Sequence, residues 1–152
     1  MWAQLAPAYG ASIRIDWRAG SAPVLGDRGR LTRAIDNLIC NALEHGGGRV
    51  SIEAERLSGR VRVTVRDQGP GIGVEIADRP DAHWGAIRGH GLAIAREAIL
   101  DHGGTLVARS GLLGGRLIVD LPLADRLAPS DRSLRGERRS GARAGRRVYR
   151  AA

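Results

Sequence analysis

The 152-residue sequence contains no lysine and no phenylalanine, and its only cysteine is Cys40. One cysteine can form no internal disulfide and cannot supply the ligand set of a structural zinc site. No apolar run approaches the roughly 18 residues of a membrane span, and the N-terminus lacks the basic and apolar regions of a signal peptide. We therefore expect a cytoplasmic protein, with a length suited to one domain with its own core.

All 24 basic residues are arginines, which outnumber the 16 acidic residues and give a net charge of +8. Residues 1–125 carry a net charge of only +1, whereas residues 126–152 carry +7. The second segment has few large apolar residues, so we predict a disordered, arginine-rich tail. Such a tail is compatible with nucleic-acid or membrane contact, and equally with a solubilising extension.

Hydrophobic periodicity divides residues 1–125 into alternating strands and helices. The predicted strands are 12–17, 49–56, 60–67, 105–110 and 116–121. The predicted helices are 29–45, with Asp27 as its N-cap, and 90–102, which glycines end. This β-α-β-β-α-β-β order predicts an α+β fold, a two-layer α/β sandwich with both helices on one face of a mixed, mainly antiparallel sheet.

The first helix carries a pair of asparagines, Asn37 and Asn41, whose spacing places them on one helical face. We place Arg33 and Glu44 on that same face, opposite the leucine and isoleucine stripe. Asparagine is a poor residue for a helix interior, and its carboxamide oxygen suits a magnesium ion that keeps water and phosphate ligands. A solvated polar face is the alternative interpretation.

Two glycine-rich motifs follow. Asp67-Gln-Gly-Pro-Gly71 ends a valine-rich strand, where an acid can accept a proton from the exocyclic amine of a base; a tight turn is the alternative. Gly89-His-Gly91-Leu-Ala opens the second helix, where backbone N–H groups can face a phosphate; a simple hinge is the alternative.

In this order, the three motifs resemble the ATP-binding catalytic domain of sensor histidine kinases, within the gyrase–Hsp90–histidine kinase–MutL superfamily. The resemblance covers about residues 5–124 and includes the closing segment from Gly114-Gly115 to Pro122. It implies the Bergerat nucleotide-binding fold, with ATP and Mg²⁺ as cofactors.

The resemblance also implies residue roles. Asn41 would bind the Mg²⁺ that bridges the ATP phosphates, and Asn37 would support the same site. Asp67 would accept the adenine amine, while Gly69 and Gly71 would let the backbone pass close to the purine. These residues stand in the sequence where the family motifs require them.

Four further residues would contact the nucleotide from the second glycine motif, and two from the edges of the others. Gly89 and Gly91 would hinge a lid over the phosphates and offer backbone donors. The remaining residues assigned to the site are Ile72 beside the purine, His45 near the adenine, His90 towards the phosphates and Leu92 beneath the lid.

The resemblance implies a protein-histidine kinase of two-component signalling. Gyrase and Hsp90 relatives have a glutamate where Asn37 stands, so the asparagine favours phosphoryl transfer to a protein side chain over ATP hydrolysis. With no space for a phosphoacceptor hairpin in 152 residues, we expect the acceptor histidine on a separate dimerisation-hairpin protein, which passes phosphate to a response regulator. The alternatives are a non-catalytic ATP-binding regulator and an anti-sigma-type serine kinase.

Overall fold

The computed structural model describes residues 2–71, 90–111, 114–124 and 148–149. In chain order the elements are α1 (Trp2–Leu5), the 3₁₀ turn η1 (Ala6–Tyr9), β1 (Ser12–Trp17), β2 (Val24–Leu25), α2 (Arg28–His45), β3 (Arg49–Leu57), β4 (Arg60–Asp67), α4 (His90–Asp101), β5 (Thr105–Gly111), β6 (Gly114–Pro122) and β7 (Val148–Tyr149). Each predicted helix and strand is present, with bounds within two residues of those expected. The α1, η1, β2 and β7 segments were not predicted.

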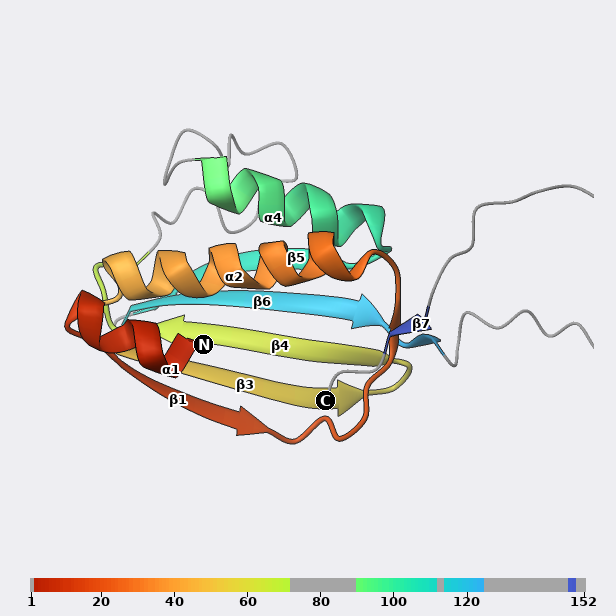
Figure 1. Cartoon of the computed structure of the whole chain (residues 1–152), viewed down its shortest axis with the longest axis horizontal. Helices are drawn as coiled ribbons and strands as arrows, with labels where there is room; N and C mark the ends of the chain where they lie inside the picture. Colours follow the sequence, from red (N-terminus) through yellow and green to blue (C-terminus); the bar gives the residue numbers. More distant parts are fainter. Residues whose placement is uncertain (1, 72–89, 112–113, 125–147, 150–152) are drawn as a thin grey trace, which may run out of the picture.

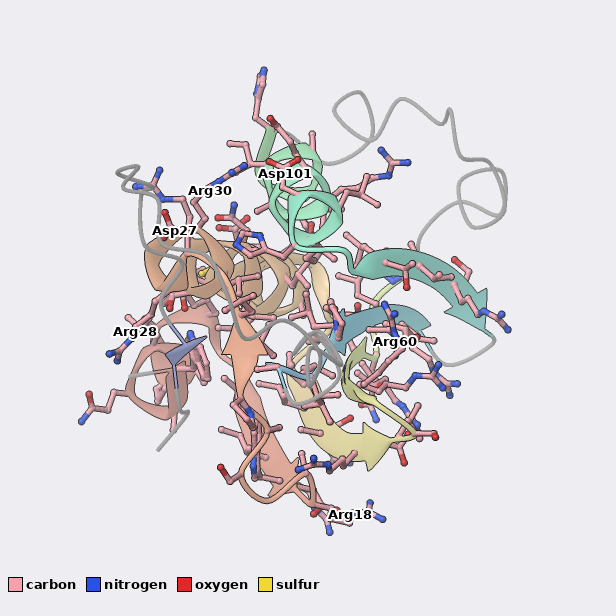
Figure 2. All side chains as sticks on the ribbon, turned by 90° about the vertical axis from the view of Figure 1, so that its right-hand side faces the viewer. Arg18, Asp27, Arg28, Arg30, Arg60 and Asp101 are labelled. Atoms are coloured by element: carbon pink, nitrogen blue, oxygen red, sulfur yellow. The ribbon has the colours of Figure 1, made fainter. Side chains whose placement is uncertain are left out.

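Five strands form one sheet in the order β1-β3-β4-β6-β5. The β1 and β3 strands pair in parallel, whereas the other three pairs are antiparallel. Helices α2 and α4 lie side by side on one face of this sheet (Figure 1). The view along the sheet in Figure 2 places both helices on the same side. The predicted two-layer α+β architecture is therefore confirmed.

The core lies between these two layers. Alternate valines of β4 point towards the helices and are buried, as the period-two pattern of a half-covered strand requires. Leu38 and Ile39 of α2 and Ile99 of α4 are fully buried in the same core, where α2 packs on β4 and α4 packs on α2 and β5. This packing fixes α2 over the centre of the sheet.

Because Leu38 is fully buried, we expect Leu38→Ala to lower the free energy of unfolding by about 3 kcal/mol, through lost burial and the cavity it leaves. Leu5→Ala is the matched control, since Leu5 is 42% exposed, and it should cost less than about 1 kcal/mol. Urea titrations of both variants test this, and equal midpoints would contradict the described core.

Hydrogen bonds and an ion pair connect the first turn of α2 to the end of α4. The Asp27 carboxylate accepts the Arg30 backbone N–H, as predicted for an N-cap, and this bond lowers the pKa of Asp27. The Asp27 N–H donates to His102 Nε2, and Arg30 pairs with Asp101 at 2.6 Å. Figure 2 shows Asp27, Arg30 and Asp101 gathered at this junction. These contacts hold the two helices in a defined relative position.

Two residues of the predicted tail belong to a strand. Val148 and Tyr149 form β7, which pairs antiparallel with β2. The rest of 126–152 lies outside the described residues, so its disorder stays a prediction. Within the described residues, no helix has the length and apolar character needed to cross a membrane.

Candidate functional site

The two asparagines of α2 lie on its α4-facing side. Asn37 is half-buried, and its amide donates to the Gly91 carbonyl at 3.1 Å. Asn41, one turn later, is only 8% exposed. Its amide nitrogen is buried and has no hydrogen-bond partner among the described residues. An unpaired buried amide costs about 1–3 kcal/mol, so Asn41 is poorly explained as a structural residue.

The expected position of this pair was partly wrong. We placed both asparagines on a face opposite the apolar stripe, but Asn41 is buried beside it. Arg33 and Glu44, placed on the same face, are exposed. The difference arises because α4 packs against this edge of α2, which the sequence of α2 alone does not indicate. The solvated-face alternative therefore fails for Asn41.

Asp67 is the last residue of β4 and is only 9% exposed. Its Oδ1 atom accepts two backbone N–H groups, from Gly69 at 2.9 Å and Gly115 at 3.0 Å. A carboxylate has about four lone-pair sites on its two oxygens, so the side chain keeps capacity for another donor. The two bonds fix the orientation of the carboxylate, which a solvated turn residue would not need.

Glycines surround Asp67 closely. A Cβ at Gly115 would lie 2.8 Å from Asp67 Oδ2, and one at Gly46 would lie 2.7 Å from Asp67 Cβ. A Cβ at Gly69 would meet the His45 carbonyl, and one at Gly114 would meet the Asp67 carbonyl. These four positions bring the end of α2, the end of β4 and the start of β6 together around one carboxylate.

We expect Gly115→Ala to weaken nucleotide binding about tenfold or more, because the new methyl group would displace the Asp67 carboxylate. Gly20→Ala is the control: it lies in open space, and its positive φ makes the alanine costly for the fold rather than for the site. Calorimetric titration with ATP compares the two variants. Equal affinities would show that the Asp67 position does not control binding.

The second glycine motif is partly described. His90 is the first residue of α4 and is exposed. Gly91 follows it and lies against Asn37, and Leu92 is buried on the inner side of α4. A Cβ at Gly91 would meet the Asn37 side chain at ordinary contact distance. Ile72 and Gly89, assigned to the site from sequence, lie outside the described residues.

Two residues at the end of α2 also bear on the site. His45 is exposed, and its backbone carbonyl faces Gly69, so it lies next to the Asp67 motif as expected. The Glu44 carboxylate lies 3.9 Å from His45 Nε2.

Burial, together with Glu44 and Asp36, raises the pKa of Cys40, which therefore stays a thiol at neutral pH.

The motifs lie in succession along α2. Asn37 touches Gly91, Asn41 follows one turn later, and the helix ends at the Asp67 cluster. From Asn37 to His45 the helix rises about 12 Å, at 1.5 Å per residue. An elongated ligand can thus meet Asp67 at one end, the start of α4 at the other, and the Asn41 carboxamide between them.

A metal ion in this site would be held by the Asn41 carboxamide and by oxygen atoms of water and of the bound phosphates. The described residues contain no group of three His, Cys, Asp or Glu side chains placed to hold an ion. The unpaired Asn41 amide fits such an ion, because a carboxamide can rotate to present oxygen in place of nitrogen. Mg²⁺ commonly keeps water and phosphate ligands and takes few from protein.

Sequence reasoning missed Gly46, Gly114 and Gly115 as parts of the site. We expected Gly114 and Gly115 in a hairpin turn, but they begin β6, and β6 pairs with β4 in a register that brings Gly115 to Asp67. The sequence does show these glycines next to other glycines, which is a signal of tight backbone packing. The strand register that gives them their role depends on tertiary packing.

Comparison with known proteins gives consistent matches. The family model described as "Histidine kinase-, DNA gyrase B-, and HSP90-like ATPase" matches residues 26–125. The C4-dicarboxylate transport sensor protein DctB of Rhizobium meliloti is 34% identical over 74% of this chain. The sensor histidine kinase CpxA of Escherichia coli is 31% identical over 80% of it. The family-model match takes in all three motifs.

Solved structures agree with the fold. The ATP-binding domain of PrrB from Mycobacterium tuberculosis superposes with a TM-score of 0.62 at 26% identity, over 80% of this chain and 88% of that one. The chain spans only 20% of the length of DctB and 29% of CpxA. The similarity therefore concerns one domain of these larger proteins.

Proposed function

The chain belongs to the histidine kinase-, DNA gyrase B- and HSP90-like ATPase family, as an ATP-binding catalytic domain of the sensor histidine kinase type; from this premise we propose that it binds Mg·ATP along α2 and transfers the γ-phosphate to a histidine of a separate dimerisation hairpin. The observation that carries the proposal is the succession along α2 from the fixed Asp67 carboxylate, past the unpaired Asn41 amide, to Gly91.

At the Asp67 end, the chemistry favours adenine. The carboxylate is held by two backbone N–H groups and only accepts hydrogen bonds when ionised, so it suits the exocyclic amine of adenine. Guanine presents a carbonyl oxygen at the equivalent position, which would face the carboxylate without a proton. We infer a preference for ATP over GTP.

At the other end, the site suits phosphates. Gly91 and its neighbours open a 12-residue helix whose first N–H groups lack helical partners and face an anion favourably. Asn41 would hold Mg²⁺, with Asn37 beside it, and the ion would neutralise charge on the phosphates during transfer. The Asn37–Gly91 bond positions the start of α4 against α2.

The same residues favour transfer over hydrolysis. Catalysis of phosphoryl transfer is largely positioning and charge stabilisation, which Asn41 and backbone donors supply without a general base. Asn37 is neutral, and Glu44 is exposed and turned towards His45. Within one turn of Asn41 on α2, Asn37 bonds to Gly91, while Glu44 and His45 are exposed towards the proposed adenine end.

The described histidines do not supply the acceptor. Both ring nitrogens of His102 are in hydrogen bonds at the far end of α4, and His45 lies at the proposed adenine end. His90 is exposed at the start of α4, beside the proposed phosphates, where a lid contact is its simplest role. We therefore place the acceptor on a partner hairpin, and a response regulator downstream of it.

The test is transfer of label from γ-labelled ATP to an added dimerisation hairpin with a single histidine. We expect acid-labile, base-stable phosphate on the hairpin, abolished when that histidine is replaced by alanine. Nucleotide binding without transfer to any hairpin histidine would favour a non-catalytic ATP-binding regulator. Acid-stable phosphate on a serine would favour the anti-sigma type of kinase.

A further inference from the structure

The face of the sheet away from α2 and α4 carries a row of arginines. Strand pairing aligns Arg14 of β1 with Ser51 of β3, Ser51 with Arg66 of β4, Arg66 with Arg116 of β6, and Arg116 with Arg109 of β5. These side chains alternate with the buried residues that face the helices. No described helix or strand covers this side of the five-stranded sheet (Figure 2).

Most of these charges are unpaired. Arg66 contacts Glu53 at 3.2 Å, but the Arg66 Nε atom is buried and has no partner among the described residues. Arg14, Arg109 and Arg116 are exposed and make no ion pair within the described chain. Like charges on directly opposed strands destabilise a sheet, so the row has a cost that an anion would relieve.

At the other end of the strands, an arginine on the same face is neutralised by an ion pair. Four residues further along β4 and β6, Arg62 and Asp120 form an ion pair with two hydrogen bonds, both 2.8 Å long. Charge on this face is therefore matched at one end of the strands and left positive at the other. The near-neutral total for residues 1–125 conceals this separation, because it averages over both ends.

The positive end is hollowed. A cavity of about 750 Å³ is lined by the four arginines of the row, by Arg49, and by Ser12 and Ser51. Its lining also includes Asp67, Gln68, Gly114 and Gly115, so the cavity adjoins the Asp67 end of the nucleotide site. Its volume falls in the range of small-ligand sites. The lining combines guanidinium forks, which bind phosphate oxygens in pairs, with neutral donors between them.

We propose that this arginine-lined cavity binds a linear polyphosphate, beside the Asp67 end of the nucleotide site. The ligand class follows from spacing. Neighbouring strands lie about 4.8 Å apart, so the charges of Arg66, Arg116 and Arg109 recur at this interval, while Ser51 separates Arg14 from them. Adjacent phosphates share a bridging oxygen and match closely spaced charges, whereas acidic side chains on one face of an extended peptide repeat at about 6.7 Å.

The lining also argues against nucleic acid. Single-stranded nucleic acids are held by basic grooves in which aromatic side chains stack on the bases. Among the described residues, the lining of the cavity includes no aromatic side chain, and Ile13 and Val50 are its only large apolar members. A chain of phosphates without bases matches the five arginines of the cavity, while the Asp67 carboxylate at its edge is already bonded to two backbone N–H groups.

The test uses the full chain, with tripolyphosphate as the probe, in EDTA to remove divalent cations. Calorimetry measures affinity, and ¹⁵N spectra of arginine Nε–H groups locate the bound ligand. The double variant Arg109→Gln/Arg116→Gln removes exposed charges of the cavity, and Arg28→Gln is the control at an exposed arginine on α2. Asn41→Ala reports whether the nucleotide site takes part.

We expect saturable binding, shifts of the Arg66 and Arg116 Nε–H signals, and about tenfold weaker binding per cavity arginine removed. Arg28→Gln and Asn41→Ala should keep the parent affinity. Signal shifts confined to arginines of 126–152, or equal losses in Arg28→Gln, would overturn the site. Poly-glutamate binding as tightly per charge would overturn the phosphate assignment in favour of an acidic protein partner.

Discussion

Asp67→Asn is expected to lower ATP affinity about a hundredfold and to remove the preference for ATP over GTP. The carboxylate uses Oδ1 for the Gly69 and Gly115 N–H groups. An asparagine must keep its one oxygen there, which turns its amide donor towards the donor amine of adenine. A lost charged hydrogen bond combined with opposed donors is worth about 3 kcal/mol, or roughly a hundredfold.

Calorimetric titrations with ATP and GTP measure both effects on the same protein. Asp101→Asn is the matched control, because it removes an equal charge from an exposed pair with Arg30 at the far end of α4. That variant should bind ATP as the parent does. Parent-like ATP affinity in Asp67→Asn, with circular dichroism showing an intact fold, would contradict the assignment of Asp67 to adenine.

Asn41→Ala is expected to stabilise the free protein while it lowers phosphoryl transfer about a hundredfold. The substitution removes a buried amide without a partner and introduces a better helix former, which together should add about 1 kcal/mol to the free energy of unfolding. The same change removes the proposed Mg²⁺ ligand, and loss of groups that hold a catalytic metal costs about 10–100-fold or more.

Thermal melts with and without Mg·ATP separate these effects. The parent should melt higher with Mg·ATP, since a ligand that binds only the folded state raises its stability, and Asn41→Ala should not. Thr32→Ala, at an exposed position of the same helix, should behave as the parent. A destabilised Asn41→Ala protein that retains its Mg·ATP shift would show that Asn41 is structural.

The elements that sequence patterns predicted were those with strong local signals. The valine alternation of β4 and the capped apolar stripe of α2 give nearly the observed bounds, because burial on one face dictates both patterns. The short β2 and β7 strands have no such pattern, and their pairing joins residues more than 120 positions apart. Contacts of this kind depend on the whole fold.

The candidate site also combines residues that local sequence predicts with features that depend on the whole fold. Asn37, Asn41 and Asp67 were identified from residue type and spacing, and their roles in nucleotide binding stay a prediction. The structure shows Asn37 bonded to Gly91, the Asn41 amide buried and Asp67 held by two backbone N–H groups. The burial of Asn41 was missed, because the packing of α4 on α2 causes it. The role of Gly115 follows from the β4–β6 register, which local sequence does not specify.

Charge shows the limit of composition most clearly. Residues 1–125 carry a net charge of only +1, a total that does not indicate any basic surface. Strand register instead collects Arg14, Arg66, Arg109 and Arg116 into one row, while Arg62 is neutralised by Asp120. Net charge over a domain therefore carries no information about such a local patch.

The most direct test of the central claim is a crystal structure of the chain with Mg²⁺ and a non-hydrolysable ATP analogue. We predict the adenine amine within hydrogen-bond distance of the Asp67 carboxylate, a metal ion on the Asn41 carboxamide oxygen, and phosphates towards Gly91. An analogue bound only in the arginine-lined cavity, or with its base away from Asp67, would contradict the proposed nucleotide site.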